Sequence, residues 1–344
     1  MQSKVKNRNQ FVDMMRGIAM LMVVLGHTMT GCTSNAQASF LFNIVWSIQM
    51  PLFILISGYV TKYSHKIGNW SDFICYLQRR TVAYMLPWVV WSFIIRGFIF
   101  EKYNFFDIKY ILWNMDSGYW FLATIWTISV IFGVASYVAE CFIKEDGIKK
   151  QCVVLVVYIC GMLALLGLGL VFGLSFFAIK LTLYYMPFYF AGYLFGQYDD
   201  RLLSNPMGRR FADCMIALCT VWWIYIVLRY SLYDMNDNGW YIILRAGTSL
   251  TGCIMICGLL QSATLKNKVS PPPVLVYAGK ISLEIYLMHY LMLNLVRPTY
   301  VPTVNSVMGI ILVLINYLAT LALSVFVIQM IGNNSILKRI IFGK

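Results

Sequence analysis

Long apolar runs separated by short polar gaps dominate this chain of 344 residues. Each run is close to the roughly 20 residues that an α-helix needs to cross the hydrocarbon core of a bilayer. Ten such runs are present, near residues 11–31, 39–61, 82–100, 119–141, 152–173, 176–197, 212–231, 241–263, 275–296 and 304–331. Only a short turn around Gly173 separates the fifth run from the sixth. The pattern predicts an all-α, polytopic membrane protein with about ten transmembrane helices.

The composition agrees with a membrane protein, because 60% of the residues are hydrophobic and only 12% are charged. A soluble domain carries about twice that charged share. No internal repeat, low-complexity tract or appended soluble domain is evident. We therefore expect a single transmembrane domain over residues 1–344, with a helical core of about 11–331 and short cytoplasmic termini. The first run lacks a small-residue cleavage site, so we expect it to be retained.

The net charge is +13, and the basic residues are distributed unevenly among the gaps between the apolar runs. Lys and Arg number 18 in one alternate set of gaps and termini and 3 in the other. This alternation is typical of the positive-inside rule and predicts that both termini face the cytoplasm. It explains the basic charge better than nucleic-acid binding does.

The first apolar run carries three ionisable residues, Asp13, Arg16 and His27. Such groups are costly at membrane depth and mark functional positions in a bundle interior or a water-filled cavity. Arg16 and His27 are separated by about 1100° of helical rotation, roughly 20° from alignment, and by roughly 16 Å along the axis. Asp13 precedes Arg16 by one turn on the same side. One end of a long ligand could therefore lie near Arg16 while its reactive end lies near His27.

Several roles are open to these side chains. An imidazole exchanges protons near neutral pH, so His27 could deprotonate an acceptor hydroxyl or could itself take an acyl group. It could also simply bridge helices. Arg16 could be neutralised by Asp13 as a structural pair, or it could bind an anionic or carbonyl-bearing ligand through its planar donors.

The second run contains Met50-Pro51-Leu52-Phe53 and Ser57-Gly58-Tyr59. Alone, these residues predict a packing helix that opens around the proline. Preceded by an arginine, ten residues and a histidine, the pattern resembles the acyltransferase-3 family of integral membrane proteins. Members of that family move acyl groups, often acetyl, from cytosolic acyl-CoA to glycans or other acceptors at the membrane. The resemblance implies that His27 is catalytic and that Arg16, oriented by Asp13, is essential to the same site.

Basic residues near the cytoplasmic end of the third run also resemble the family. Arg79 and Arg80 correspond to a motif that the family uses to hold the phosphates of CoA, although ordinary positive-inside flanking explains either residue alone. The family's further arginine one turn later is replaced by Ala83-Tyr84. The resemblance then implies a weaker phosphate clamp, or one completed by Lys62 or Lys66.

Other signatures suggest the acceptor side. Tyr119-Trp120-Phe121-Leu122 resembles the family's tryptophan-phenylalanine-leucine signature, or forms an interfacial aromatic belt. The run 279–289 resembles its serine–tyrosine–leucine–histidine segment, in which His289 is either a second acid–base group or a structural hydrogen-bonding residue. Small residues around Gly192 and Gly196 predict close helix packing. The candidate acceptor-binding residues are Tyr119, Trp120, Arg245, Glu284, Tyr286 and His289.

These patterns together favour a membrane-bound acyltransferase of the cell (inner) membrane. Its donor would be acyl-CoA, and acetyl-CoA is the favoured candidate. Its acceptor would be a hydroxyl of a glycan, a lipid-linked sugar or a similar envelope molecule. We expect no metal, because most cysteines lie in apolar runs without histidine partners and suit helix packing.

Two other classes remain open. A transporter or flippase for a lipid-linked sugar or exported polymer fits the many spans, but the internal repeat typical of transporters is not evident. A scaffold or sensor would tolerate loss of His27. The sequence leaves open the acceptor, the acyl group (acetyl, succinyl or longer), direct transfer against an acyl-enzyme, and the oligomeric state.

Overall fold

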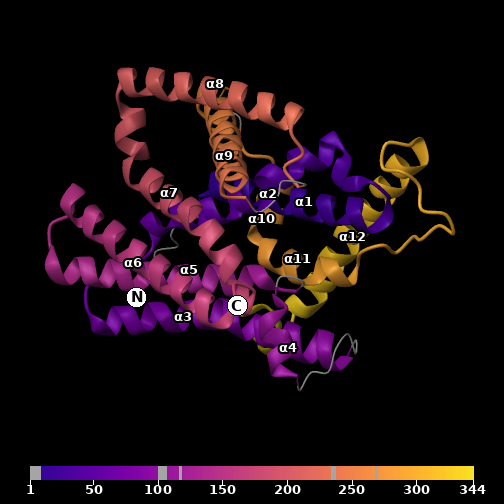
Figure 1. Ribbon diagram of the computed structural model, residues 1–344, viewed down its shortest axis with the longest axis horizontal. Coiled ribbons are helices and arrows are strands. Elements are labelled where there is room, and N and C mark those ends of the chain that lie inside the picture. The colour runs from indigo at the N-terminus through magenta and orange to yellow at the C-terminus, as the bar shows by residue number, and fades with distance from the viewer. Residues whose placement is uncertain (1–8, 100–106, 116–117, 234–237, 268–269) are drawn as a thin grey trace. The chain divides into compact units, whose positions relative to one another are not determined.

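The computed structural model describes residues 9–99, 107–115, 118–233, 238–267 and 270–344 (Figure 1). Most of these residues are helical, and within those ranges the only β-type pairing is one isolated bridge between Ser34 and Thr303. The predicted all-α class is therefore confirmed. Some basic residues of the charge alternation lie outside the described residues, namely Lys4, Lys6, Arg8, Lys102 and Lys268.

Seven helices of the described ranges are long and apolar enough to cross a membrane. They are α1 (Gln10–Cys32), α2 (Phe40–Tyr59), α5 (Trp120–Phe142), α6 (Ile148–Phe172), α8 (Pro206–Arg229), α9 (Gly239–Asn267) and α12 (Val307–Gly332). Each matches one of the ten predicted spans. The chain is thus a multi-pass membrane protein, while the count of ten stays a prediction.

The other three predicted spans are built differently. In the third, α3 (Trp70–Val89) starts well before residue 82 and passes into the π-helix η3 (Val90–Ile99). In the sixth, α7 (Ile179–Ser204) follows a 3₁₀ turn, η5 (Phe176–Ala178), and its tyrosines and Lys180 lower its hydropathy. In the ninth, the chain breaks at Ile281 into α10 (Pro273–Lys280) and α11 (Ser282–Met288), and the 3₁₀ turn η6 (His289–Leu291) follows. The pieces of the ninth are each too short to cross a bilayer as one helix.

Short helices complete the chain, namely η1 (Ala36–Ala38), η2 (Val60–Tyr63), α4 (Ile108–Trp113) and α13 (Ser335–Phe342). The predicted turn between the fifth and sixth spans is present. There α6 ends at Phe172, and Gly173 adopts a φ of 91°, a left-handed conformation that a glycine adopts without steric cost.

The chain forms two compact units. The first unit combines Met1–Lys62 with Phe190–Gln329, and the second combines Tyr63–Tyr189 with Met330–Lys344. In the first unit, α1 packs against α2 and α10, and α9 packs against α2 and α8. In the second, α5 packs between α3 and α6, and the C-terminal α13 packs on α3.

Glycines allow backbones in the first unit to approach closely. A Cβ on Gly192 of α7 would lie 1.9 Å from the Leu55 carbonyl oxygen, and one on Gly196 would lie 2.8 Å from that of Tyr59. The predicted packing role of this small-residue run is confirmed. Where α1 meets α10, a Cβ on Gly17 would lie 2.1 Å from the Leu275 carbonyl oxygen. Side chains at these positions would force the helices apart.

Candidate active site

The first helix carries the predicted stripe of ionisable residues. The Asn9 side chain caps α1 by accepting hydrogen bonds from the backbone N–H groups of Phe11 and Val12, at 3.0 and 3.3 Å. The helix then runs without interruption to Cys32, so Asp13, Arg16 and His27 lie on one helix as predicted. Asp13 lies in the first turn, where the helix dipole favours a negative charge, and is 1% exposed.

The structure brings His27 together with two residues more than 260 positions later. The rings of His27 and His289 have centroids 5.3 Å apart, and those of His27 and Tyr290 are 4.7 Å apart. His289 and Tyr290 are themselves 4.6 Å apart. Both belong to η6, the turn that directly follows α11. We call these three residues the His27 cluster.

Hydrogen bonds distinguish the two histidines of the cluster. The Tyr290 hydroxyl lies 3.2 Å from His27 Nε2 and 3.4 Å from Nδ1. His289 Nδ1 lies 3.1 Å from the Ile285 carbonyl oxygen. A carbonyl only accepts, so His289 carries its proton on Nδ1 and keeps Nε2 as an acceptor. That Nε2 is buried and has no hydrogen-bond partner within the described part of the chain.

Exposure separates the cluster into an inner and an outer side. His289 is 0% exposed, whereas Tyr290 is 37% exposed and His27 is half-buried. The side chains of His27 and Tyr290 are therefore partly accessible, whereas that of His289 is enclosed.

The segment before the cluster carries the other residues predicted there. Tyr286 is 6% exposed, and its ring lies 5.9 Å from that of His289. Glu284 is buried in α11, whereas Lys280 is exposed at the end of α10. The break at Ile281 places Lys280 at the end of α10 and Glu284 in α11.

The paired arginines predicted to hold phosphate differ from one another. Arg79 is exposed on α3. The Arg80 guanidinium lies 5.2 Å from the centroid of the Tyr76 ring, and its Nη1 donates to the Tyr84 hydroxyl at 3.3 Å. Tyr84, which stands about where the family carries a further arginine, thus holds Arg80. Arg79 remains the more accessible cation of the pair.

Lys62 is engaged by carboxylates in the first unit. Its Nζ lies 2.6 Å from Asp199 Oδ2 and 3.9 Å from Asp200 Oδ2. The Tyr59 hydroxyl donates to the same Asp199 oxygen at 2.6 Å, and the Tyr59 ring lies beneath the Lys62 ammonium at 4.5 Å. Asp199 is 3% exposed. This buried pairing favours a structural role for Lys62 over phosphate binding.

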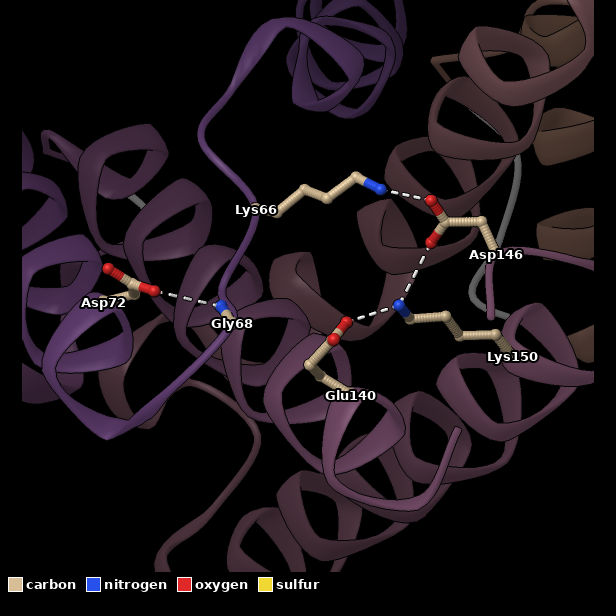
Figure 2. Close-up of polar contacts among 6 residues, drawn as sticks. All are labelled: Lys66, Gly68, Asp72, Glu140, Asp146 and Lys150. Carbon is tan, nitrogen blue, oxygen red and sulfur yellow. Dashed lines mark hydrogen bonds and ion pairs between the residues drawn. The ribbon is translucent and has the colours of Figure 1, made fainter. Parts of the chain in front are cut away.

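Lys66 is paired in the second unit, as Figure 2 shows. Its ammonium contacts Asp146, whose other oxygen accepts from Lys150 at 3.1 Å, and Lys150 also pairs with Glu140. Hydrogen bonds from Lys66 and then from Lys150 lower the pKa of Asp146 below its ordinary value. Asp146 lies in the short connection between α5 and α6, and Lys150 lies at the start of α6. Lys66 reaches them from the segment before α3.

The aromatic signature predicted for the acceptor side lies in the second unit. Tyr119 is 2% exposed and lies against Trp91, at 5.6 Å between ring centroids, and below Arg96, at 5.8 Å. Trp120 is half-buried and stacks on Tyr185 at 5.4 Å. Arg245 belongs to the first unit, half-buried on α9.

Sequence reasoning missed Tyr290 and Asp199. Tyr290 directly follows the predicted His289, but nothing in the sequence shows which neighbour of that histidine faces α1. Asp199 lies 137 residues from Lys62, and pairing over that distance becomes visible only in the fold.

Comparisons with known proteins bear on the same region. The family model Acyl_transf_3, described as an acyltransferase domain, matches residues 9–329. No curated protein and no solved structure matches the chain. The match covers nearly the whole chain, including α1 with its ionisable stripe and the segment of His289. The chain therefore belongs to the acyltransferase-3 family of membrane proteins.

Proposed function

We propose that this protein transfers an acyl group, acetyl in the first instance, from cytosolic acyl-CoA to a hydroxyl of a glycan or a lipid-linked sugar. The observation that carries the proposal is the His27 cluster in a chain of the acyltransferase-3 family. An accessible imidazole beside a tyrosine hydroxyl can take a proton from an acceptor hydroxyl while that hydroxyl attacks the thioester.

The other residues of α1 suit the donor. Arg16 is half-buried below His27 on the same helix, and its planar fork can bind a carbonyl or an anion while Asp13 orients it. The uncharged pantetheine arm of CoA is comparable in length to the roughly 16 Å between these positions. The nucleotide would stay at the inner surface, since burying its phosphates in hydrocarbon without paired cations is costly. The resemblance to the family makes Arg79, which is exposed, a candidate to contact the nucleotide phosphates.

This proposal assumes the predicted topology, in which ten spans cross the cell's inner membrane and both termini face the cytoplasm. The exposed Glu145, between α5 and α6, tests it. Changed to cysteine in a cysteine-free background, Glu145 should react with an impermeant maleimide only after the membrane is opened. Labelling in intact cells would overturn the topology.

The activity is tested with purified protein in detergent or nanodiscs. His27→Ala should fold normally and lose acetyl-CoA-dependent transfer, while His65→Ala, a change of an exposed loop residue, should keep it. Mass analysis of surface glycans from cells with and without the protein identifies the acceptor. Wild-type protein that never consumes acyl-CoA but moves a lipid-linked sugar would support a transporter instead. A His27→Ala variant with near-normal transfer would overturn the site.

A further inference from the structure

Tyr290 is the polar neighbour of His27 to which no role has been given. Its hydroxyl is within reach of both ring nitrogens, at 3.2 and 3.4 Å, and its ring packs on His27 and His289. It is also partly open to the outside, at 37% exposure. It is therefore placed to act on His27 without being sealed from the substrate.

A base in acyl transfer needs an orienting partner. A neutral imidazole has one N–H and one lone pair, and the lone pair must face the hydroxyl that loses its proton. The usual partner that accepts the N–H is a carboxylate. The carboxylate of α1, Asp13, precedes His27 by 14 residues, which is roughly 21 Å along the axis. It is too far away to accept that hydrogen.

His289 does not supply this partner. Its own N–H is used by the Ile285 carbonyl oxygen, and the His27 ring faces it through a tilted ring contact. Within the described residues, the side-chain hydrogen-bond contact of His27 is Tyr290. His289 therefore supports the cluster by packing, and the tyrosine hydroxyl is left to fix the orientation of His27.

We propose that Tyr290 is the positioning residue of His27. Its hydroxyl oxygen lies 3.2 and 3.4 Å from the two ring nitrogens, and it accepts the N–H of one of them once the ring turns toward it, which leaves the lone pair of the other nitrogen for the acceptor. This inference rests on the proposed function. A phenol oxygen thus takes the place that a carboxylate holds in other acyltransfer sites.

The step balances with this arrangement. The acceptor oxygen bonds to the thioester carbonyl carbon as its proton passes to the free nitrogen of His27. The carbon–sulfur bond then breaks, and the CoA thiolate takes the proton back from the imidazolium. The products are the acyl ester and free CoA thiol, and Tyr290 ends with the proton it began with.

The test is Tyr290→Phe, which keeps the ring that packs on both histidines and removes only the hydroxyl. We expect kcat to fall by at least tenfold. KM for acetyl-CoA should stay within twofold of the wild-type value, and the thermal midpoint should stay within a few degrees of it. The matched control is Tyr277→Phe, an exposed tyrosine of α10 whose hydroxyl accepts from Gln329 at 3.2 Å. It should leave kcat unchanged.

A double variant separates positioning from general damage. Because Tyr290 acts through His27, adding Tyr290→Phe to His27→Ala should lower the residual single-turnover rate no further. If Tyr290→Phe fails to fold, 3,5-difluorotyrosine at position 290 keeps the ring and weakens the oxygen as an acceptor, and kcat should again fall.

The outcomes distinguish this inference from the function on which it rests. If His27→Ala abolishes transfer while Tyr290→Phe has wild-type kcat, the positioning role is wrong and the function stands. A raised KM at unchanged kcat, or equal further losses in both backgrounds, would also overturn the role. If wild-type protein transfers nothing, the proposed function itself fails.

Discussion

The backbone of Gly279 lies so close to Asp13 that a Cβ atom on the glycine would be 1.7 Å from the Asp13 carbonyl oxygen. α10 and α1 thus touch through their main chains, next to the ionisable stripe of α1. The segment that continues from α10 carries His289 and Tyr290 to His27. The spacing between these two helices therefore determines the geometry of the His27 cluster.

We expect Gly279→Ala to separate α10 from α1, lowering stability by about 1–3 kcal/mol or more and reducing transfer together with it. Thermal unfolding in detergent and an activity assay measure both. Gly247→Ala on α9 is the control, because a Cβ there meets nothing within 4 Å. Equal melting of the two variants would show that the helix contact is looser than described.

The Lys62–Asp199 pair should matter for stability more than for donor binding. Asp199→Ala leaves a lysine ammonium and the Tyr59 hydroxyl without their shared acceptor, and breaking a buried pair in this way costs about 3–5 kcal/mol. Lys66→Ala, at a pair whose side chains are 76% and 61% exposed, should cost less than about 1 kcal/mol. Melting temperatures compare the two. A stable Asp199→Ala variant with a raised KM for acyl-CoA would instead place Lys62 in the donor site.

Arg79 and Arg80 should separate in their effects. Arg79→Ala removes an exposed cation and should raise the apparent KM for acyl-CoA severalfold, more so at low salt, with stability unchanged. Arg80→Ala also removes the contacts with Tyr76 and Tyr84 and should lower stability by about 0.5–2 kcal/mol. Steady-state kinetics at two salt concentrations, with melting curves, test this. An unaltered KM in both variants would exclude them from donor binding.

The Asp146 network predicts a specific pH dependence. Because the pKa of Asp146 is lowered in the folded state by Lys66 and then Lys150, its contribution to stability is present above the ordinary aspartate pKa of about 3.9. That contribution is lost as the pH falls through the lower folded pKa. Asp146→Asn should therefore be slightly less stable than wild type at pH 5–7, because solvent screens a surface ion pair and keeps its contribution to stability small. In strong acid the two proteins should be equally stable.

Melting curves from strong acid to pH 7 measure this difference. The control is Glu145→Gln, an exposed neighbour outside the network of Figure 2, which should show no such convergence. A difference between Asp146→Asn and wild type that persists or grows in acid would contradict the linkage.

The sequence by itself determined the membrane class and most of the spans. The length of an apolar run is a local property, and the thickness of the bilayer sets the length that a spanning helix needs. The stripe of Asp13, Arg16 and His27 was equally predictable, since helical periodicity places residues of one helix without reference to any other. The resemblance carried by this helix and the next also led to the family that the comparison establishes.

Only the tertiary structure decided what surrounds each of these residues. The chain breaks at Ile281, so the ninth predicted span is two helices and a turn, and the first of these helices, α10, packs closely against Asp13 and Gly17 of α1. Tyr290 reached His27, and Asp199 reached Lys62, through contacts between segments far apart in the chain. No local pattern encodes such contacts, because they follow from which helix faces pack together.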